Sequence, residues 1–140
     1  MRLGLNSACV IANDPILQSK WKKERKINKV SGQEVLFDQI KFHKPDVLWI
    51  DDFHKVDADL LSKVRIELPS VRLIVGYHCS PYNLKVVDKM KYTDFIITCT
   101  PGMKIEFEKL GLKCYHVYHA FDNLLMSRIE SLSIRSSASS

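Results

Sequence analysis

Polar side chains follow the apolar runs of this chain, at the positions where the sequence predicts that strands end. The set is Asn13, Asp14, Asp51, Asp52, His78, Ser80, Thr98, Thr100, His119 and Asp122. The carboxyl ends of parallel strands meet at one edge of a sheet, so residues far apart in sequence can converge on one crevice. A neutral imidazole can act as a base near pH 7, which makes His78 and His119 the candidates for proton transfer.

The same residues also have purely structural interpretations, and these stay open at this point. Asp51 and Asp52 can cap the turn after their strand, and Thr100 can cap the helix that follows it. The start of that helix could also hold an anion on its free backbone amides. His78 and His119 can equally be hydrogen-bonded structural histidines, and spacing alone assigns no Ser-His-Asp or Cys-His set.

Short strands alternating with short helices must position these residues. We expect strands at 7–12, 46–50, 72–77, 94–99 and 114–118. From the second onward the strands start near residues 46, 72, 94 and 113, so their starts recur every 19 to 26 residues, which leaves room for one strand, one helix and two loops. Right-handed crossovers then produce a parallel sheet with helices on both faces. The sequence thus predicts an α/β fold, a Rossmann-like three-layer sandwich with a parallel sheet of about five strands.

Local signals mark where the helices begin and end. Ser31 and Glu34 have the spacing of a capping box, and Asp57 can cap the next helix. Thr100 precedes Pro101, which stands at the first position of a helix. Gly111 is expected to end this helix, because the residue after a helix often has a left-handed backbone conformation. Further helices are expected after Asn13-Asp14, at 83–90 and from about Asn123. The continuous apolar run at 46–50 suggests a strand buried on both faces.

The composition is that of a globular protein of one domain. The chain has 140 residues with 46% apolar and 26% charged residues, and its longest apolar runs fall far short of a bilayer span. We expect one Rossmann-like domain at 1–130 and a Ser-rich, disordered tail at 131–140. No signal-peptide pattern opens the sequence, so the expected location is cytoplasmic.

Much of the net charge of +5 comes from one basic cluster: Lys20, Lys22, Lys23, Arg25, Lys26 and Lys29. This cluster can be a solvated helix face and basic loop, or a patch for phosphate or an anionic membrane surface. No nucleic-acid-binding motif accompanies it, so we expect no nucleic-acid partner, no transmembrane segment and, at most, peripheral membrane contact.

The four cysteines are Cys9, Cys79, Cys99 and Cys114, and no two have C-x-x-C spacing. All four fall in or at the ends of expected strands, which favours buried thiols over zinc or disulfide use. No G-x-G-x-x-G or P-loop is present either. We therefore expect no metal or cofactor site, and the chain looks as if it starts partway into a fold.

The order of these motifs resembles the N-terminal half of GT-B-type glycosyltransferases, in particular the bacterial group that includes spore-maturation-type proteins. The matching pieces are LGLNSACVIANDPILQSKW, FDQIKFHKPDVLWIDD, RLIVGYHCSP, TDFIITCTPGMKIEFEKLG and HAFD, which together cover most of 3–122. The resemblance implies transfer of a sugar from a nucleotide-sugar donor to an acceptor, without a metal. It further implies that this chain forms the acceptor-side half and is inactive without a donor-binding half.

The resemblance also suggests roles for individual residues. His78 is the first choice for base or acceptor contact, and the same side of the cleft would be lined by Asp52, Ser80, Thr100 and His119. Two alternatives remain. A receiver-like signalling domain of flavodoxin-like topology would use Asp51 or Asp52 as phosphoacceptor, although Thr100-Pro101 stands where Lys-Pro is expected. A non-catalytic binding module would bind a glycan or protein without turnover.

Overall fold

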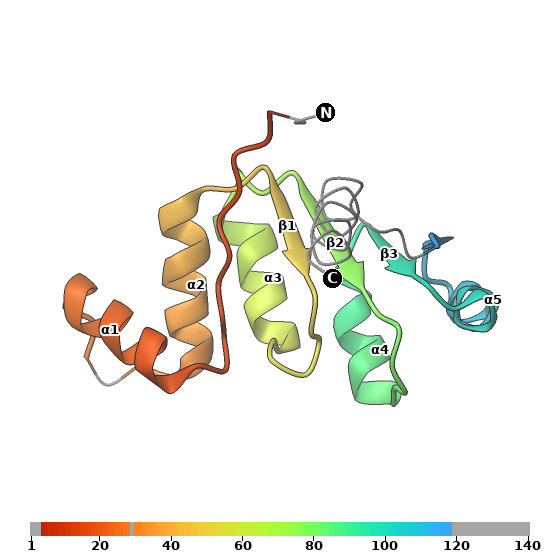
Figure 1. Ribbon diagram of the computed structural model, residues 1–140, viewed down its shortest axis with the longest axis horizontal. Coiled ribbons are helices and arrows are strands. Elements are labelled where there is room, and N and C mark those ends of the chain that lie inside the picture. The colour runs from red at the N-terminus through yellow and green to blue at the C-terminus, as the bar shows by residue number, and fades with distance from the viewer. Residues whose placement is uncertain (1–3, 29, 119–140) are drawn as a thin grey trace, which may run out of the picture.

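Helices and short parallel strands alternate along the part of the chain that the computed structural model describes, residues 4–28 and 30–118 (Figure 1). The strands are β1 (Val47–Ile50), β2 (Leu73–Tyr77), β3 (Phe95–Thr98) and β4 (Cys114–His116). The helices are α1 (Pro15–Arg25), α2 (Gly32–His43), α3 (Ala58–Glu67), α4 (Leu84–Met90) and α5 (Pro101–Lys109). All strand pairs are parallel, in the order β1-β2-β3-β4. The predicted α/β class and parallel, Rossmann-like sheet are confirmed.

Side-chain caps begin α1, α2 and α3 where the sequence predicts these helices. The Asp14 carboxylate accepts from two backbone N–H groups of the first turn of α1. The capping box before α2 is complete, because Glu34 N–H donates to Ser31 Oγ at 3.2 Å and Ser31 N–H donates to Glu34 Oε2 at 2.7 Å. Asp57 Oδ1 accepts from Leu60 N–H at 2.7 Å before α3. These bonds satisfy backbone donors that a helix start would otherwise leave free.

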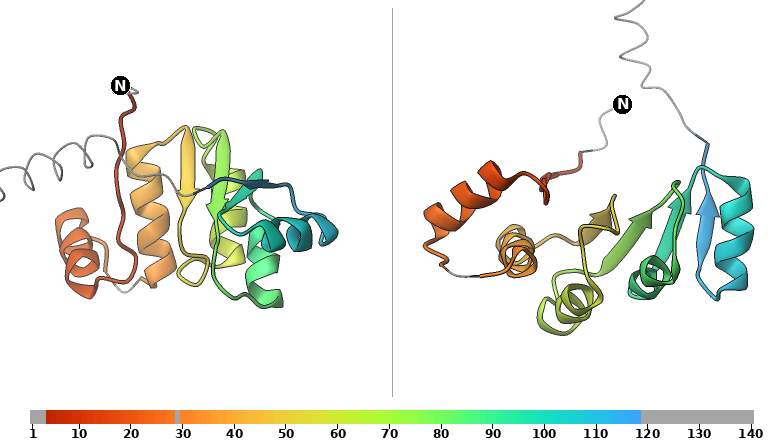
Figure 2. Two further views of the ribbon diagram at one scale, coloured as in Figure 1. Left: turned by 45° about the vertical axis from the view of Figure 1, so that its right-hand side comes forward. Right: turned by 90° about the horizontal axis from the view of Figure 1, so that it is seen from below.

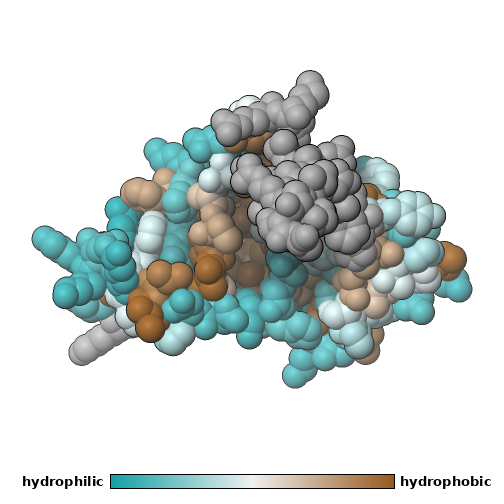
Figure 3. Space-filling view, viewed as in Figure 1, coloured by the Kyte–Doolittle hydropathy of each residue, from teal (hydrophilic) through white to brown (hydrophobic). Residues whose placement is uncertain are grey.

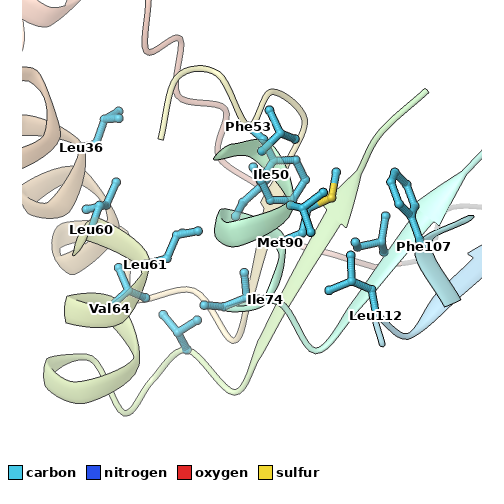
Figure 4. Packing of buried hydrophobic residues seen from close by; sticks show 14 of the residues in the cluster. Leu36, Ile50, Phe53, Leu60, Leu61, Val64, Ile74, Met90, Phe107 and Leu112 are labelled. Atoms are coloured by element: carbon cyan, nitrogen blue, oxygen red, sulfur yellow. The ribbon is translucent and has the colours of Figure 1, made fainter. Parts of the chain in front are cut away.

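The core lies between one face of the sheet and the helices α3, α4 and α5, and Leu36 and Phe37 of α2 also belong to it. Its buried members from the strands include Ile50, Ile74, Ile96 and Cys114, and those from the helices include Leu61, Val64, Met90 and Phe107. Figure 4 labels Ile50, Ile74 and the four helix residues. Strands added in one direction by right-handed crossovers keep their connecting helices on one side. Figure 2 shows α3 and α4 on the same side of the strands.

The opposite face of the sheet carries apolar side chains that the described helices do not cover. Val47 is 49% exposed and Trp49 is 51% exposed, so the predicted burial of 46–50 on both faces is wrong. Trp49 instead stacks on Tyr77 of the neighbouring strand, with ring centroids 6.0 Å apart. Within the described ranges the helices α3 to α5 thus form one outer layer of the sandwich, and the other face retains residues suited to burial.

The predicted strand at 7–12 is not formed, so four of the five predicted strands are present in the described residues. The segment runs past α2 and β1 (Figure 1), but no backbone hydrogen bond within the described part joins it to β1. Its Val10 and Ile11 are exposed, and only Ala12 packs against the core cluster. Apolar composition alone did not predict this segment correctly, because a strand also needs a neighbouring strand for its backbone hydrogen bonds.

Candidate functional site

His78 directly follows β2, an interior strand, at the carboxyl edge of the sheet. Its backbone N–H donates to Ile97 O at 3.0 Å, which extends the parallel ladder by one residue. Its side chain is only 4% exposed. The rings of Phe53, Tyr82 and Phe107 surround the imidazole, with centroids 6.1 to 6.3 Å away. The sheet edge therefore holds this histidine in an aromatic cage on the core side.

Burial, more than the polar neighbours, determines the protonation of His78. Its Nε2 lies 3.4 Å from Ser80 Oγ, and Ser80 is exposed. Burial lowers the pKa of His78 below its ordinary value, and the electrostatic interaction with the nearby His54 acts in the same direction. A hydrogen bond with the backbone of Ser80 and the charge of Asp52 oppose this shift without cancelling it. The imidazole is therefore neutral near pH 7 and can accept a proton.

Asp52 follows β1 at the same edge and is exposed. Its Oδ1 accepts a hydrogen bond from His54 N–H at 2.8 Å, which is the turn-capping role that the structural interpretation allows. Its charge nevertheless reaches His78, where it favours the protonated form. Asp52 therefore caps its turn and also acts on the candidate base through space.

Thr100 occupies the cap position of α5, but its side chain makes no capping hydrogen bond. The backbone N–H of Thr100 donates instead to Thr98 Oγ1 at 3.2 Å, and its hydroxyl lies 3.8 Å from Cys99 Sγ. The predicted position of Thr100 is confirmed, whereas the side-chain cap suggested for it is not formed.

The structure brings some of the sequence-predicted residues together. His78 and Ser80 are in contact, Asp52 acts on His78 by its charge, and Thr100 follows the neighbouring strand at the same edge. His119, the remaining candidate, lies outside the described residues, as do Asp122 and the predicted tail at 131–140.

Two further residues of the site were not predicted. His54 acts on the pKa of His78, and Tyr82 packs against the imidazole while donating its hydroxyl to Glu106 Oε2 at 2.8 Å. His54 stands two residues after Asp52 in the same loop, and that proximity was the available signal. Tyr82 carries no comparable signal, because its contact with His78 depends on how the loop before α4 folds back.

The basic cluster belongs mainly to α1. Lys20 pairs with Glu24 at 3.8 Å, and Arg25 pairs with Asp38 at 3.2 Å. Beside α1 and α2 lies a hollow of about 230 Å³, lined in part by Val10, Ile11, Leu17 and Trp21. Figure 3 shows brown, apolar surface over this region of the molecule. Part of the basic charge is thus neutralised locally, next to an apolar surface.

Only one of the four cysteines is fully buried. Cys9 is exposed, Cys79 and Cys99 are half-buried, and Cys114 is buried. The expectation of buried thiols therefore holds for Cys114 and is wrong for Cys9, whose strand is not formed.

Within residues 4–28 and 30–118, no group of three or more His, Cys, Asp or Glu side chains is arranged to hold a metal ion. Among the described helices, none combines the length and apolarity that a bilayer span requires. Comparison of the chain with protein-family models, with curated proteins and with solved structures found no match.

The lowered pKa of His78 predicts a pH-dependent stability. The unfolded imidazole takes a proton more readily than the buried one. The contribution of neutral His78 to the free energy of unfolding should therefore be complete above about pH 6.5. It should then decrease as the pH falls from there through the lower pKa of the folded state. Urea unfolding between pH 5 and pH 8 measures this slope.

The variant His78→Gln should lose this part of the pH dependence, whereas His43→Gln at the exposed end of α2 should retain it. An unchanged slope in His78→Gln would show that His78 is not the group responsible.

Proposed function

We propose that this chain forms the acceptor-side half of a glycosyltransferase, in which His78 takes a proton from the acceptor hydroxyl. The observation that carries the proposal is the neutral imidazole held at the carboxyl end of an interior parallel strand, 3.4 Å from the Ser80 hydroxyl. This edge is where open α/β sheets bind their ligands. The motif order that resembles GT-B enzymes supports the same assignment.

The proposed proton path uses the difference in exposure between His78 and Ser80. His78 is buried and Ser80 is exposed, so the Ser80 hydroxyl connects Nε2 with the open edge of the sheet. The acceptor hydroxyl gives its proton to Ser80 Oγ while Ser80 gives its own to His78 Nε2. The acceptor oxygen then attacks the sugar, and the nucleotide diphosphate leaves. The Asp52 charge stabilises the imidazolium that forms.

The donor in this proposal is a nucleotide-sugar, and its binding requires a second, donor-binding half. Thr100 would line the acceptor site from the next strand, and His119 is assigned there by resemblance only. The reaction takes place in the cytoplasm in this proposal, and peripheral membrane contact would use the basic face of α1.

One alternative is favoured by a specific observation. The exposure of His78 is only 4%, which suits a structural imidazole and hence a non-catalytic binding module at the same edge. The receiver-like interpretation gains no such support, because the consecutive order β1-β2-β3-β4 differs from the flavodoxin-like order 2-1-3-4-5.

The proposal is tested with the complete gene product that carries this chain. It is incubated with UDP-, GDP-, ADP- and dTDP-sugars in the presence of a cell extract as a source of acceptors, and the released nucleotide diphosphate is measured. We expect release from one donor, and at least a tenfold loss of this release in His78→Gln. The control His43→Gln should keep the rate, because His43 lies at the exposed end of α2.

Three outcomes distinguish the glycosyltransferase hypothesis from the binding-module hypothesis and test the role of His78. Release from no donor would contradict a transferase and favour the binding module. Nucleotide release that is unaffected by His78→Gln would support a transferase activity but contradict the assignment of His78 as the base. A loss in Ser80→Ala comparable with that in His78→Gln would support the relay through the Ser80 hydroxyl.

A further inference from the structure

Cys79 and Cys99 stand opposite each other where β2 and β3 end. Tyr77 pairs with Ile97, so two further residues along each chain place Cys79 opposite Cys99. The backbone bond from His78 N–H to Ile97 O shows that the ladder continues past the strand ends. Neighbouring strands lie about 4.8 Å apart. This spacing falls within the range of about 4.4 to 6.8 Å that separates the Cα atoms of bonded cysteines.

The sulfur of Cys79 points toward Cys99. The backbone N–H of Cys99 donates to Cys79 Sγ at 2.8 Å, and Thr98 Oγ1 lies 3.6 Å from the same sulfur. In a continuing parallel ladder this N–H would donate to a carbonyl oxygen of the neighbouring strand. The Cys79 sulfur takes the place of that carbonyl, which holds it beside the residue that carries the second thiol.

The surroundings of Cys79 favour its reactive form. Burial raises the pKa of the Cys79 thiol, but interactions with Cys99, Tyr77 and Thr98, among them the hydrogen bond from Cys99 N–H, outweigh this and lower it. The same contacts with Cys79 and Cys99 raise the pKa of Tyr77, which therefore stays a hydrogen-bond donor. A thiolate is the form of cysteine that attacks oxidants. Both cysteines are half-buried, whereas Cys114 is buried.

We propose that Cys79 and Cys99 form a thiol modification site that a hydroperoxide converts to a disulfide. The Cys79 thiolate attacks a peroxide oxygen, the O–O bond breaks, and sulfenic acid and hydroxide (or alkoxide) result. The Cys99 thiol then attacks the Cys79 sulfur, the S–O bond breaks, and water leaves with the thiol proton. The two thiols lose two electrons and the peroxide gains them. The site is independent of the proposed transferase activity, although it adjoins His78 in the chain.

Peptide mapping tests the proposal directly, because trypsin separates all four cysteines. Cys9, Cys79, Cys99 and Cys114 fall in peptides 3–20, 73–85, 92–104 and 114–128. The reduced chain is treated with one equivalent of hydrogen peroxide, alkylated, and digested without reductant. We expect one dominant linked product, peptide 73–85 joined to 92–104, and its loss on treatment with dithiothreitol.

Matched variants separate the roles of the two thiols. Cys99→Ser should leave Cys79 as a sulfenic acid that dimedone traps, and Cys79→Ser should abolish both the link and the trapping. Cys9→Ser should still form the 79–99 link, and circular dichroism confirms that each variant is folded. The proposal is overturned if peroxide leaves both thiols free, oxidises them without a link, or links either of them mainly to Cys9.

Discussion

An alanine at position 76 should destabilise the fold by about 3 kcal/mol. Gly76 lies within β2 and is buried, and a Cβ added there would lie 2.8 Å from Phe53 Cε2 and closer still to Phe53 Cζ. Phe53 has no exposed surface and packs beside Ile50 and Met90 (Figure 4). It therefore cannot move away without disturbing the core. Urea unfolding at pH 7.5 measures the loss.

Gly102 in α5 provides the matched control for Gly76. A Cβ at Gly102 meets nothing within 4 Å, so Gly102→Ala should be neutral or stabilise by up to about 1 kcal/mol. The double variant Gly76→Ala/Phe53→Leu should be more stable than the sum of the single effects predicts, because the smaller side chain makes room. Equal stability of Gly76→Ala and Gly102→Ala would contradict the close approach of Phe53 to β2.

The steric clash between the added Cβ and Phe53 in Gly76→Ala should also affect the candidate site, because the centroid of the Phe53 ring lies 6.1 Å from that of the His78 ring. Displacing Phe53 should therefore change the environment of His78. The His78 signals in an NMR titration would report this change in Gly76→Ala, and Gly102→Ala should leave them unaltered.

Replacing Asp94 by alanine should cost about 2 to 3 kcal/mol of unfolding free energy. Asp94 Oδ2 accepts from Ile74 N–H at 2.6 Å and from Arg65 Nη2 at 2.6 Å. The carboxylate thus joins the start of β3 to β2 and to α3. Burial alone would raise the pKa of Asp94, but the Ile74 backbone bond and Arg65 lower it below its ordinary value. The ionised form is therefore the one that stabilises the fold.

The sign of the pH effect follows from this lowered pKa. The unfolded carboxylate takes a proton at a higher pH than the folded one, so the contribution of Asp94 is full above about pH 4. It is lost as the pH falls from there through the lower folded pKa. The stability difference between wild type and Asp94→Ala should shrink over that window.

Asp88 is the control for Asp94, because it pairs with Lys91 at 2.7 Å on an exposed surface. Asp88→Ala should cost less than about 1 kcal/mol. Comparable losses in the two variants would show that the bridge from Asp94 to Ile74 and Arg65 contributes no more than a surface pair.

Local signals accounted for much of the fold because they act over a few residues. Ser31 and Asp57 cap α2 and α3, and Gly111 adopts the left-handed conformation expected after α5, with φ of 77°. Each of these requires only the backbone of its own turn, so the sequence contains all the information. The four strands at 47–50, 73–77, 95–98 and 114–116 followed from short apolar runs between such signals.

Properties that depend on a segment far away in the sequence could not be predicted from local signals. The segment 7–12 has the composition of a strand, but within the described residues no backbone hydrogen bond joins it to a strand of the sheet. The run 46–50 has the composition of a doubly buried strand, yet Trp49 is half-exposed because α3 to α5 all lie on the other face. Composition describes what a segment can bury, and topology decides whether anything covers it.

The candidate site shows the same division. The sequence by itself determined that His78, Ser80, Asp52 and Thr100 follow strands, and hence that they share the carboxyl edge of a parallel sheet. Only the tertiary structure decided that the His78 imidazole is buried among aromatic rings and that Cys79 faces Cys99. Strand order and register, which set both facts, depend on contacts between segments about 20 residues apart along the chain.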